Sequence, residues 1–179
     1  MEDRQSWHIK EEAILDDLVA LMDLSSAEKA VLAALKPQAE AIAPQLADAF
    51  YNRLLAHPAT AEYVTGQIED RKKTLKNWFL HLFEGEYGSD YVQSRLRIGW
   101  VHVRIGLPVR YPLAMMDIIL RYGQEVARQS PQAEIATVAF QKLLSLDIAI
   151  FNQAYEDTQL KHLTEVMGNE RLARRLLTQ

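Results

Sequence analysis

Apolar residues recur along this chain every three or four positions, which is the spacing of amphipathic helices. In the segment 9–24, for example, Ile14, Leu18, Leu21 and Met22 fall on one helical face. No run of alternating apolar and polar residues is flanked by hairpin turns, as it would be in paired strands. The pattern therefore predicts an all-α fold.

Capping and breaking residues predict where the helices begin and end. Ser25 or Ser26 is a typical N-cap, with Glu28 close behind it, for a helix that runs to about Leu35. Later helices are expected at about 42–55, 69–83, 89–106, 112–128 and 132–167. The last is longer than the roughly 8–20 residues of a typical globular helix, so we expect it to extend beyond the core as a pairing surface or connector.

One predicted helix carries a histidine between two glycines. Four residues share a helical face with His102, and they are Ile98, Gly99, Ile105 and Gly106. A glycine inside a helix costs about 0.5–1 kcal/mol relative to alanine, so the close approach of a flat group is one explanation for the pair. A histidine in such a place suits an axial ligand of a haem iron. A buried core histidine in a tightly crossed helix pair is the alternative.

Composition limits the class of protein. At 179 residues the chain is long enough for one well-buried domain, or for one domain and a tail. A formal net charge of −4 argues against binding to nucleic acid or to an anionic membrane, which usually needs a concentrated basic face. No apolar run approaches the roughly 20 residues that span a bilayer, and the first residues are too acidic and polar for a signal peptide. A cytoplasmic protein is therefore expected.

The chain contains no cysteine, and this excludes several kinds of site. Disulfides, iron–sulfur clusters, cysteine-ligated zinc, thiolate-ligated haem and covalent haem attachment are all impossible, so any haem must be held noncovalently. The five histidines are then the leading candidates for a metal ligand. Phosphate-binding loops, nucleophile elbows, H-E-x-x-H helices and paired Glu-x-x-His motifs are also missing, so no motif supports catalysis.

Three segments taken together resemble the globin domain of globin-coupled sensors. They are Thr74-Leu75-Lys76, Leu82-Phe83-Glu84-Gly85 and the R-I-G-x-x-H-x-R-I-G-L run around His102, and the resemblance covers about residues 10–160. Tyr51 falls where that family carries its distal-pocket tyrosine. The resemblance implies a haem-binding globin fold with an added N-terminal helix and a shortened middle region, which senses a gas for an attached output domain.

The same resemblance implies a role for individual residues. His102 would be the proximal ligand of a noncovalent haem b, Tyr51 the distal hydrogen-bond donor, and Thr74 a second polar group near the gas. The side chains that would line the haem pocket are Leu75, Trp78, Phe79, Ile98, Ile105 and Tyr111. Each role has a plainer alternative, because an apolar residue can belong to the core, a buried tyrosine can bond a backbone carbonyl, and a helical threonine can bond the carbonyl one turn back. We expect the remaining histidines, His8, His57, His81 and His162, at the surface.

The resemblance also divides the chain and implies partners. Residues 1–24 would be an N-terminal extension with a pre-globin helix, 25–165 the sensor domain, and 166–179 the start of a linker to an output domain that the sequence lacks. That domain would be a diguanylate cyclase foremost, or else a histidine kinase or chemotaxis domain. The expected partners are dioxygen, with carbon monoxide or nitric oxide besides, and a second copy that pairs through the last two long helices.

Two other functions stay open on the sequence. One is a cofactor-free helical interaction domain, in which the glycines serve helix crossing. The other is a haem enzyme that acts on nitric oxide or peroxide, although the sequence holds no reductase segment or dedicated acid–base pair. We expect this segment to be a sensor rather than an enzyme.

Overall fold

The computed structural model describes residues 12–64 and 66–177, and the regular structure within them is entirely helical, which confirms the predicted all-α fold. The helices are α1 (Glu12–Met22), α2 (Ser26–Ala33), α3 (Lys36–Ala56), α4 (Pro58–Ala61), α5 (Ile68–His81), α6 (Ser89–Arg104), α7 (Arg110–Ala114), α8 (Met116–Ala127), α9 (Ala133–Met167) and α10 (Glu170–Leu177). Over this part of the chain, none of the helices is both long and apolar enough to cross a lipid bilayer.

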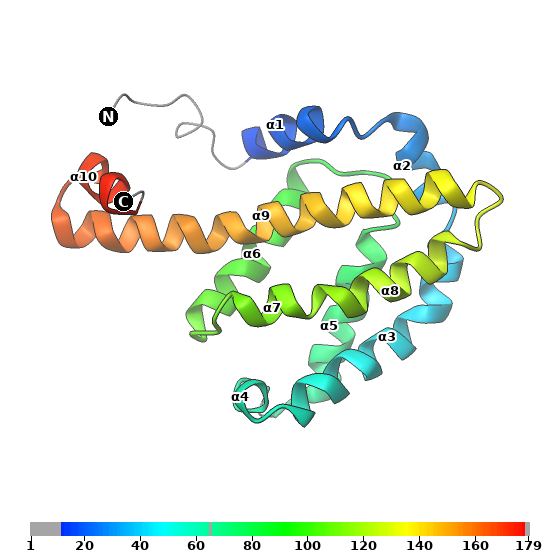
Figure 1. Ribbon diagram of the computed structural model, residues 1–179, viewed down its shortest axis with the longest axis horizontal. Coiled ribbons are helices and arrows are strands. Elements are labelled where there is room, and N and C mark those ends of the chain that lie inside the picture. The colour runs from blue at the N-terminus through cyan, green and yellow to red at the C-terminus, as the bar shows by residue number, and fades with distance from the viewer. Residues whose placement is uncertain (1–11, 65, 178–179) are drawn as a thin grey trace.

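The 35-residue helix α9 organises the fold and runs along the whole molecule (Figure 1). Helices α1, α2, α6 and α8 pack against it, while α3 packs against α5 and α8. At its C-terminal end α9 stops at Gly168, whose φ of 66° is the left-handed conformation that suits glycine at a helix end. The short α10 then folds back against α9.

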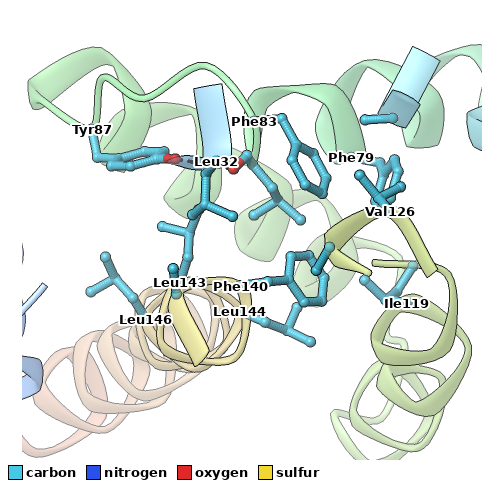
Figure 2. Packing of buried hydrophobic residues seen from close by; sticks show 14 of the residues in the cluster. Leu32, Phe79, Phe83, Tyr87, Ile119, Val126, Phe140, Leu143, Leu144 and Leu146 are labelled. Carbon is cyan, nitrogen blue, oxygen red and sulfur yellow. Dashed lines mark hydrogen bonds between the residues drawn. The ribbon is translucent and has the colours of Figure 1, made fainter. Parts of the chain in front are cut away.

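The hydrophobic core lies between α9 and the helices around it (Figure 2). Phe140 of α9 stacks on Phe83 with ring centroids 5.7 Å apart, and Phe83 meets Phe79 of α5 edge to face at 5.3 Å. All three side chains are fully buried. These rings, together with Leu143 and Leu146 from the same face of α9, join the N-terminal and C-terminal halves of the chain.

The predicted cap of the second helix is confirmed. Ser25 is the N-cap of α2, and the Glu28 amide donates to its Oγ at 3.2 Å while the Ser25 amide donates to Glu28 Oε2 at 2.8 Å. Lys142 of α9 also forms an ion pair with Glu28 at 2.8 Å. Burial by itself would raise the pKa of Glu28, but hydrogen bonds from Lys142 and Ser25 prevail and lower it. The cap therefore also fixes α2 to α9.

Two helix boundaries differ from the predicted ones. The single helix expected at 112–128 is two helices, α7 and α8, which meet at Met115, where the amide donates to the carbonyls of both Tyr111 and Pro112. The helix expected at about 42–55 begins earlier, at Lys36, so that Pro44 lies well inside a continuous α3, where it leaves the Glu40 carbonyl without its helical donor. Both residues are exposed, so water can take the place of that donor.

The two glycines around the histidine have different structural reasons, a helix crossing at Gly99 and a positive φ at Gly106. A Cβ on Gly99 would lie 2.4 Å from Ala154 Cβ and 2.9 Å from the Phe151 carbonyl oxygen, because α6 crosses α9 at this point. Gly106 follows the end of α6 with a φ of +71° and has nothing within 4 Å of the Cβ position. The interpretation that both glycines make room for a flat group is therefore wrong. At Gly99 the alternative, a tightly crossed helix pair, is what the structure contains.

Gly99→Ala tests this crossing. Helix propensity alone would stabilise the variant by up to about 1 kcal/mol. We expect the opposite sign, a loss of about 1–3 kcal/mol, because the new methyl overpacks the contact with α9. Urea denaturation measures the difference. Adding Ala154→Gly removes one of the two clashes and should restore part of the loss, and a Gly99→Ala protein at least as stable as the wild type would contradict the assignment.

Candidate functional site

A largely apolar cavity of about 440 Å³ lies between α3, α5, α6, α7 and α9. This volume is within the range of small-molecule binding sites, roughly 300–1,000 Å³. The structure brings nearly all of the predicted site residues to its walls, namely Tyr51, Thr74, Leu75, Trp78, Ile98, His102, Ile105 and Tyr111. Residues far apart in the sequence thus meet around one space.

Phe79 is the exception among the predicted lining residues. It is fully buried, and its ring packs against Phe83 in the core rather than lining the cavity. Trp78, its neighbour in sequence, lies on the adjoining face of α5 and does line the cavity. The helical stripe from Leu75 onward is wide enough to serve both core and cavity, and the sequence does not separate the two.

His102 lies in the wall of the cavity with its ring orientation fixed. Its Nδ1 is 2.7 Å from the Ile98 carbonyl oxygen, and because a carbonyl only accepts, Nδ1 must carry the proton. Burial lowers the pKa of His102, the hydrogen bond to Ile98 opposes this, and the positive charge of Arg71 lowers the pKa further. The imidazole is therefore neutral at pH 7, with Nε2 unprotonated and available as a ligand.

Tyr51 reaches the cavity from α3. Its ring meets Phe50 edge to face at 5.5 Å, and among the described residues its hydroxyl has no hydrogen-bond partner. Burial raises the pKa of Tyr51, and the charge of Arg71 offsets part of that effect. The hydroxyl thus stays protonated at neutral pH, as a donor with no acceptor among the described residues. The alternative for this residue, a bond to a backbone carbonyl, is absent from the described contacts.

Thr74 also lines the cavity, but its hydroxyl is already engaged. Thr74 Oγ1 donates to the Asp70 carbonyl oxygen at 3.0 Å, one turn back along α5. The hydroxyl of a threonine within a helix often forms this local hydrogen bond to the carbonyl one turn back. Thr74 in this arrangement can accept a hydrogen bond from a ligand but has no proton left to donate.

Sequence reasoning missed a buried polar cluster behind the cavity. Arg95 of α6 and Asp147 of α9 are only 1% and 3% exposed, and Arg95 Nε donates to Asp147 Oδ1 at 2.6 Å. Tyr91 donates its hydroxyl to the same oxygen, and Trp78 Nε1 donates to Asp147 Oδ2 at 2.9 Å. Burial, followed by the charge of Asp147, raises the pKa of Tyr91 far above its usual value.

The cluster joins three helices and has a signal in the sequence. Asp147 itself forms part of the cavity wall, so the cluster connects the cavity to α5, α6 and α9. Both charged residues interrupt apolar stripes, because Leu143 and Ile150 lie one turn either side of Asp147, and Val92 and Ile98 one turn either side of Arg95. A charge in such a position is rarely buried without a partner, so two of them predict a pair.

The other histidines that the structure describes, His57, His81 and His162, do not line the cavity. His57 and His162 are exposed, as expected, whereas His8 lies outside the described residues. The expectation that His81 is a surface residue is wrong, because it is half-buried and its Nδ1 is 3.3 Å from Arg95. Arginine only donates, so this nitrogen of His81 accepts.

Comparison with known proteins identifies relatives of this chain. A family model described as Protoglobin matches residues 11–161. The heme-based aerotactic transducer HemAT of Halobacterium salinarum is 28% identical over an alignment of 185 residues, and this alignment covers 94% of the present chain. The match covers 36% of HemAT, so this chain spans little more than a third of that relative.

Two solved structures resemble this fold. The globin domain of the Geobacter sulfurreducens globin-coupled sensor superposes with a TM-score of 0.73 at 28% identity, over 78% of this chain and 96% of that domain. The globin domain of Escherichia coli DosC in its ferric form has a TM-score of 0.66 at 17% identity, over 79% of this chain and 99% of the other. At 17% identity, the resemblance to the DosC globin domain shows a similar fold and nothing further.

Proposed function

Because this chain belongs to the Protoglobin family and is a globin domain of the globin-coupled sensor type, we propose that it binds haem b and senses dioxygen for a further domain. One observation carries the proposal. The Nδ1 proton of His102 is held by the Ile98 carbonyl, which leaves Nε2 as a free ligand in the wall of a cavity that also receives the Tyr51 hydroxyl.

The residues of the cavity fit a noncovalent haem. A haem iron held by histidine supplies a coordination position for a diatomic gas. His102 Nε2 would hold the iron, and the bond to Ile98 would orient the ring, as second-shell acceptors do for metal-bound histidines. Leu75, Ile98 and Ile105 present apolar side chains that would exclude water from the porphyrin. Without cysteine in the chain, the haem would be of the noncovalent b type.

Tyr51 would supply the hydrogen bond to the gas. Its hydroxyl is a protonated donor without a described protein acceptor, in a cavity of low polarity where such a bond is strong. Of dioxygen and carbon monoxide, dioxygen would be the better acceptor of this bond. Tyr51 thus favours dioxygen among the gases that the site could take, with carbon monoxide and nitric oxide as further ligands.

The contacts of α6 support transmission of a signal to α9. The His102 ring lies 5.4 Å from that of Phe151, and the Tyr155 hydroxyl donates to the Leu107 carbonyl at 3.0 Å. Gly99 touches Ala154 between these contacts. A shift of His102 along or across α6 would therefore press on α9 at several points. A gas biases the output only by binding one arrangement of these helices more tightly than the other.

The proposal includes a second copy and an output domain. Pairing through α8 and α9 is supported by Ile135 and Val138, which are 47% and 44% exposed on α9. The expected output is a diguanylate cyclase, which rests on the family resemblance, and the transducer named among the relatives makes a chemotaxis domain the alternative. Residues 25–165 would be the sensor domain and 166–179 the start of the linker.

Tyr51→Phe tests the distal role. A hydrogen bond to an acceptor with charge is worth about 1.5–3 kcal/mol. Its loss should speed dioxygen dissociation from the haem-loaded chain by about 10- to 100-fold, at 1.4 kcal/mol per decade. Stopped-flow absorbance after mixing with dithionite measures the rate.

Tyr122→Phe is the matched control for this variant. Tyr122 is a half-buried tyrosine of α8 that packs against the core and does not line the cavity. Its variant should release dioxygen at the wild-type rate. An unchanged rate in Tyr51→Phe, with haem bound normally, would remove Tyr51 from the proposed site and leave haem binding itself untouched.

A further inference from the structure

One cation lines the cavity without a compensating partner. Arg71 lies on α5, one turn before Thr74 and Leu75, and shares the cavity wall with them. Among the described residues its guanidinium forms no ion pair and no hydrogen bond. The next residue differs, since Lys72 pairs with Asp48 at 2.8 Å and with Glu69 at 3.2 Å. The positive charge of Arg71 is therefore available to a ligand.

The charge of Arg71 acts on the interior of the cavity. It opposes the rise that burial causes in the pKa of Tyr51 on α3, and it adds to the lowering of the pKa of His102 on α6, so the guanidinium is close enough to influence both walls. Two carboxylates also line the cavity, but Asp147 is neutralised by Arg95 and Asp70 is exposed to solvent. Of the charged side chains that line the described part of the cavity, Arg71 is thus the one that is half-buried and has no partner among the described residues.

From this arrangement we propose that Arg71 and Tyr51 form an anion subsite within the cavity, which selects small monoanions that accept hydrogen bonds over neutral ligands. The proposal rests on the proposed haem site, because the anion would bind at the iron position that His102 does not occupy. Fluoride, azide and nitrite are ligands of this class.

The chemistry of the two side chains favours such ligands. Tyr51 offers one O–H donor, and Arg71 offers up to five N–H donors with a charge that persists at every physiological pH. Hydrogen bonds to ions are the strong ones, and a partly enclosed apolar cavity screens the charge less than water does. A neutral ligand such as imidazole gains nothing from the charge of Arg71.

A carboxylate of the haem has the same chemistry as a small anion. The alternative to the anion subsite is therefore an ion pair between Arg71 and that carboxylate. The two differ in what Arg71 would control. An arginine that holds a carboxylate of the haem changes how long the haem stays bound. An arginine that serves a small anion changes the affinity for that anion and leaves haem retention alone.

The test is a titration of the ferric, haem-loaded chain with sodium fluoride and, separately, with imidazole, followed by absorbance. We expect Arg71→Leu to weaken fluoride binding by roughly 10- to 100-fold, the loss of one charge-assisted hydrogen bond. Imidazole affinity should change by less than about twofold, within the scatter of a surface substitution. Arg71→Lys keeps the charge and should retain part of the fluoride affinity.

Lys73→Leu is the matched control, because it removes an exposed positive charge from the same helix outside the cavity. It should leave both affinities unchanged. Equal fluoride affinity in Arg71→Leu and wild type would overturn the proposal, as would a parallel loss of fluoride and imidazole binding. Faster transfer of haem to apomyoglobin with unchanged fluoride affinity would assign Arg71 to the carboxylate of the cofactor instead. A wild-type chain that takes up no haem would reject the proposed function itself, before any anion is added.

Discussion

Replacement of His102 by alanine is expected to weaken haem binding by at least about 100-fold. Loss of a residue that only orients a metal ligand already costs about 10- to 100-fold in affinity, and loss of the ligand must cost more. The unprotonated Nε2 of His102 is the iron ligand that the cavity presents, since Nδ1 donates its proton to the Ile98 carbonyl. Titration of the apoprotein with haemin, followed by the Soret band, measures the affinity and the coordination state together.

Two further variants separate ligation from folding in this experiment. His102→Gly with added imidazole should recover a histidine-like spectrum, because the free ligand can enter the space that the side chain leaves. His162→Ala removes an exposed histidine of α9 and should bind haem as the wild type does. A wild-type spectrum from His102→Ala would assign the ligand to another residue.

Replacement of Arg95 by leucine is expected to destabilise the fold by about 3–5 kcal/mol, because it leaves the Asp147 carboxylate buried without its counter-charge. Asp147 would keep only the hydrogen bonds from Tyr91 and Trp78. Since these two donors come from α5 and α6, the loss should appear in the cooperative unfolding of the whole core. Urea denaturation followed by circular dichroism measures it.

An exposed ion pair supplies the control for this prediction. Arg53 and Asp117 lie 2.7 Å apart with side chains 48% and 60% exposed, and Arg53→Leu should cost no more than about 1 kcal/mol. The double variant Arg95→Leu, Asp147→Leu should recover part of the loss, although it orphans the donors of Trp78 and Tyr91 at about 1–3 kcal/mol each. An Arg95→Leu protein as stable as Arg53→Leu would contradict the importance of the cluster.

Features that depend on residues close together in the chain could be predicted from the sequence alone. Apolar spacing predicted the helices, and Ser25 with Glu28 predicted a capping box that the structure contains. These features are readable because each depends on residues within about one turn of one another. The bond from His102 to the Ile98 carbonyl also joins residues one turn apart, but it was not predicted.

The site itself was readable only in part. The resemblance to globin sensors pointed to His102 and Tyr51, and the fold brings both to one cavity. Phe79 was misplaced because core and cavity are both lined by apolar side chains, so periodicity gives the same answer for either. Thr74 was open for a similar reason, since its hydroxyl could turn toward a ligand or toward the Asp70 carbonyl.

By itself, then, the sequence determined the all-α class, most helix positions and the chemistry available to a ligand, because these follow from residue types and short spacings. The tertiary structure was needed to show that Gly99 serves the crossing with α9, that Arg95 neutralises Asp147, and that Arg71 lines the cavity with no partner among the described residues. Each of these depends on which helix packs against which. The packing partners of a helix are set by contacts between residues far apart in the chain. An apolar stripe predicts that a helix face is buried, but it does not identify the helix that covers it.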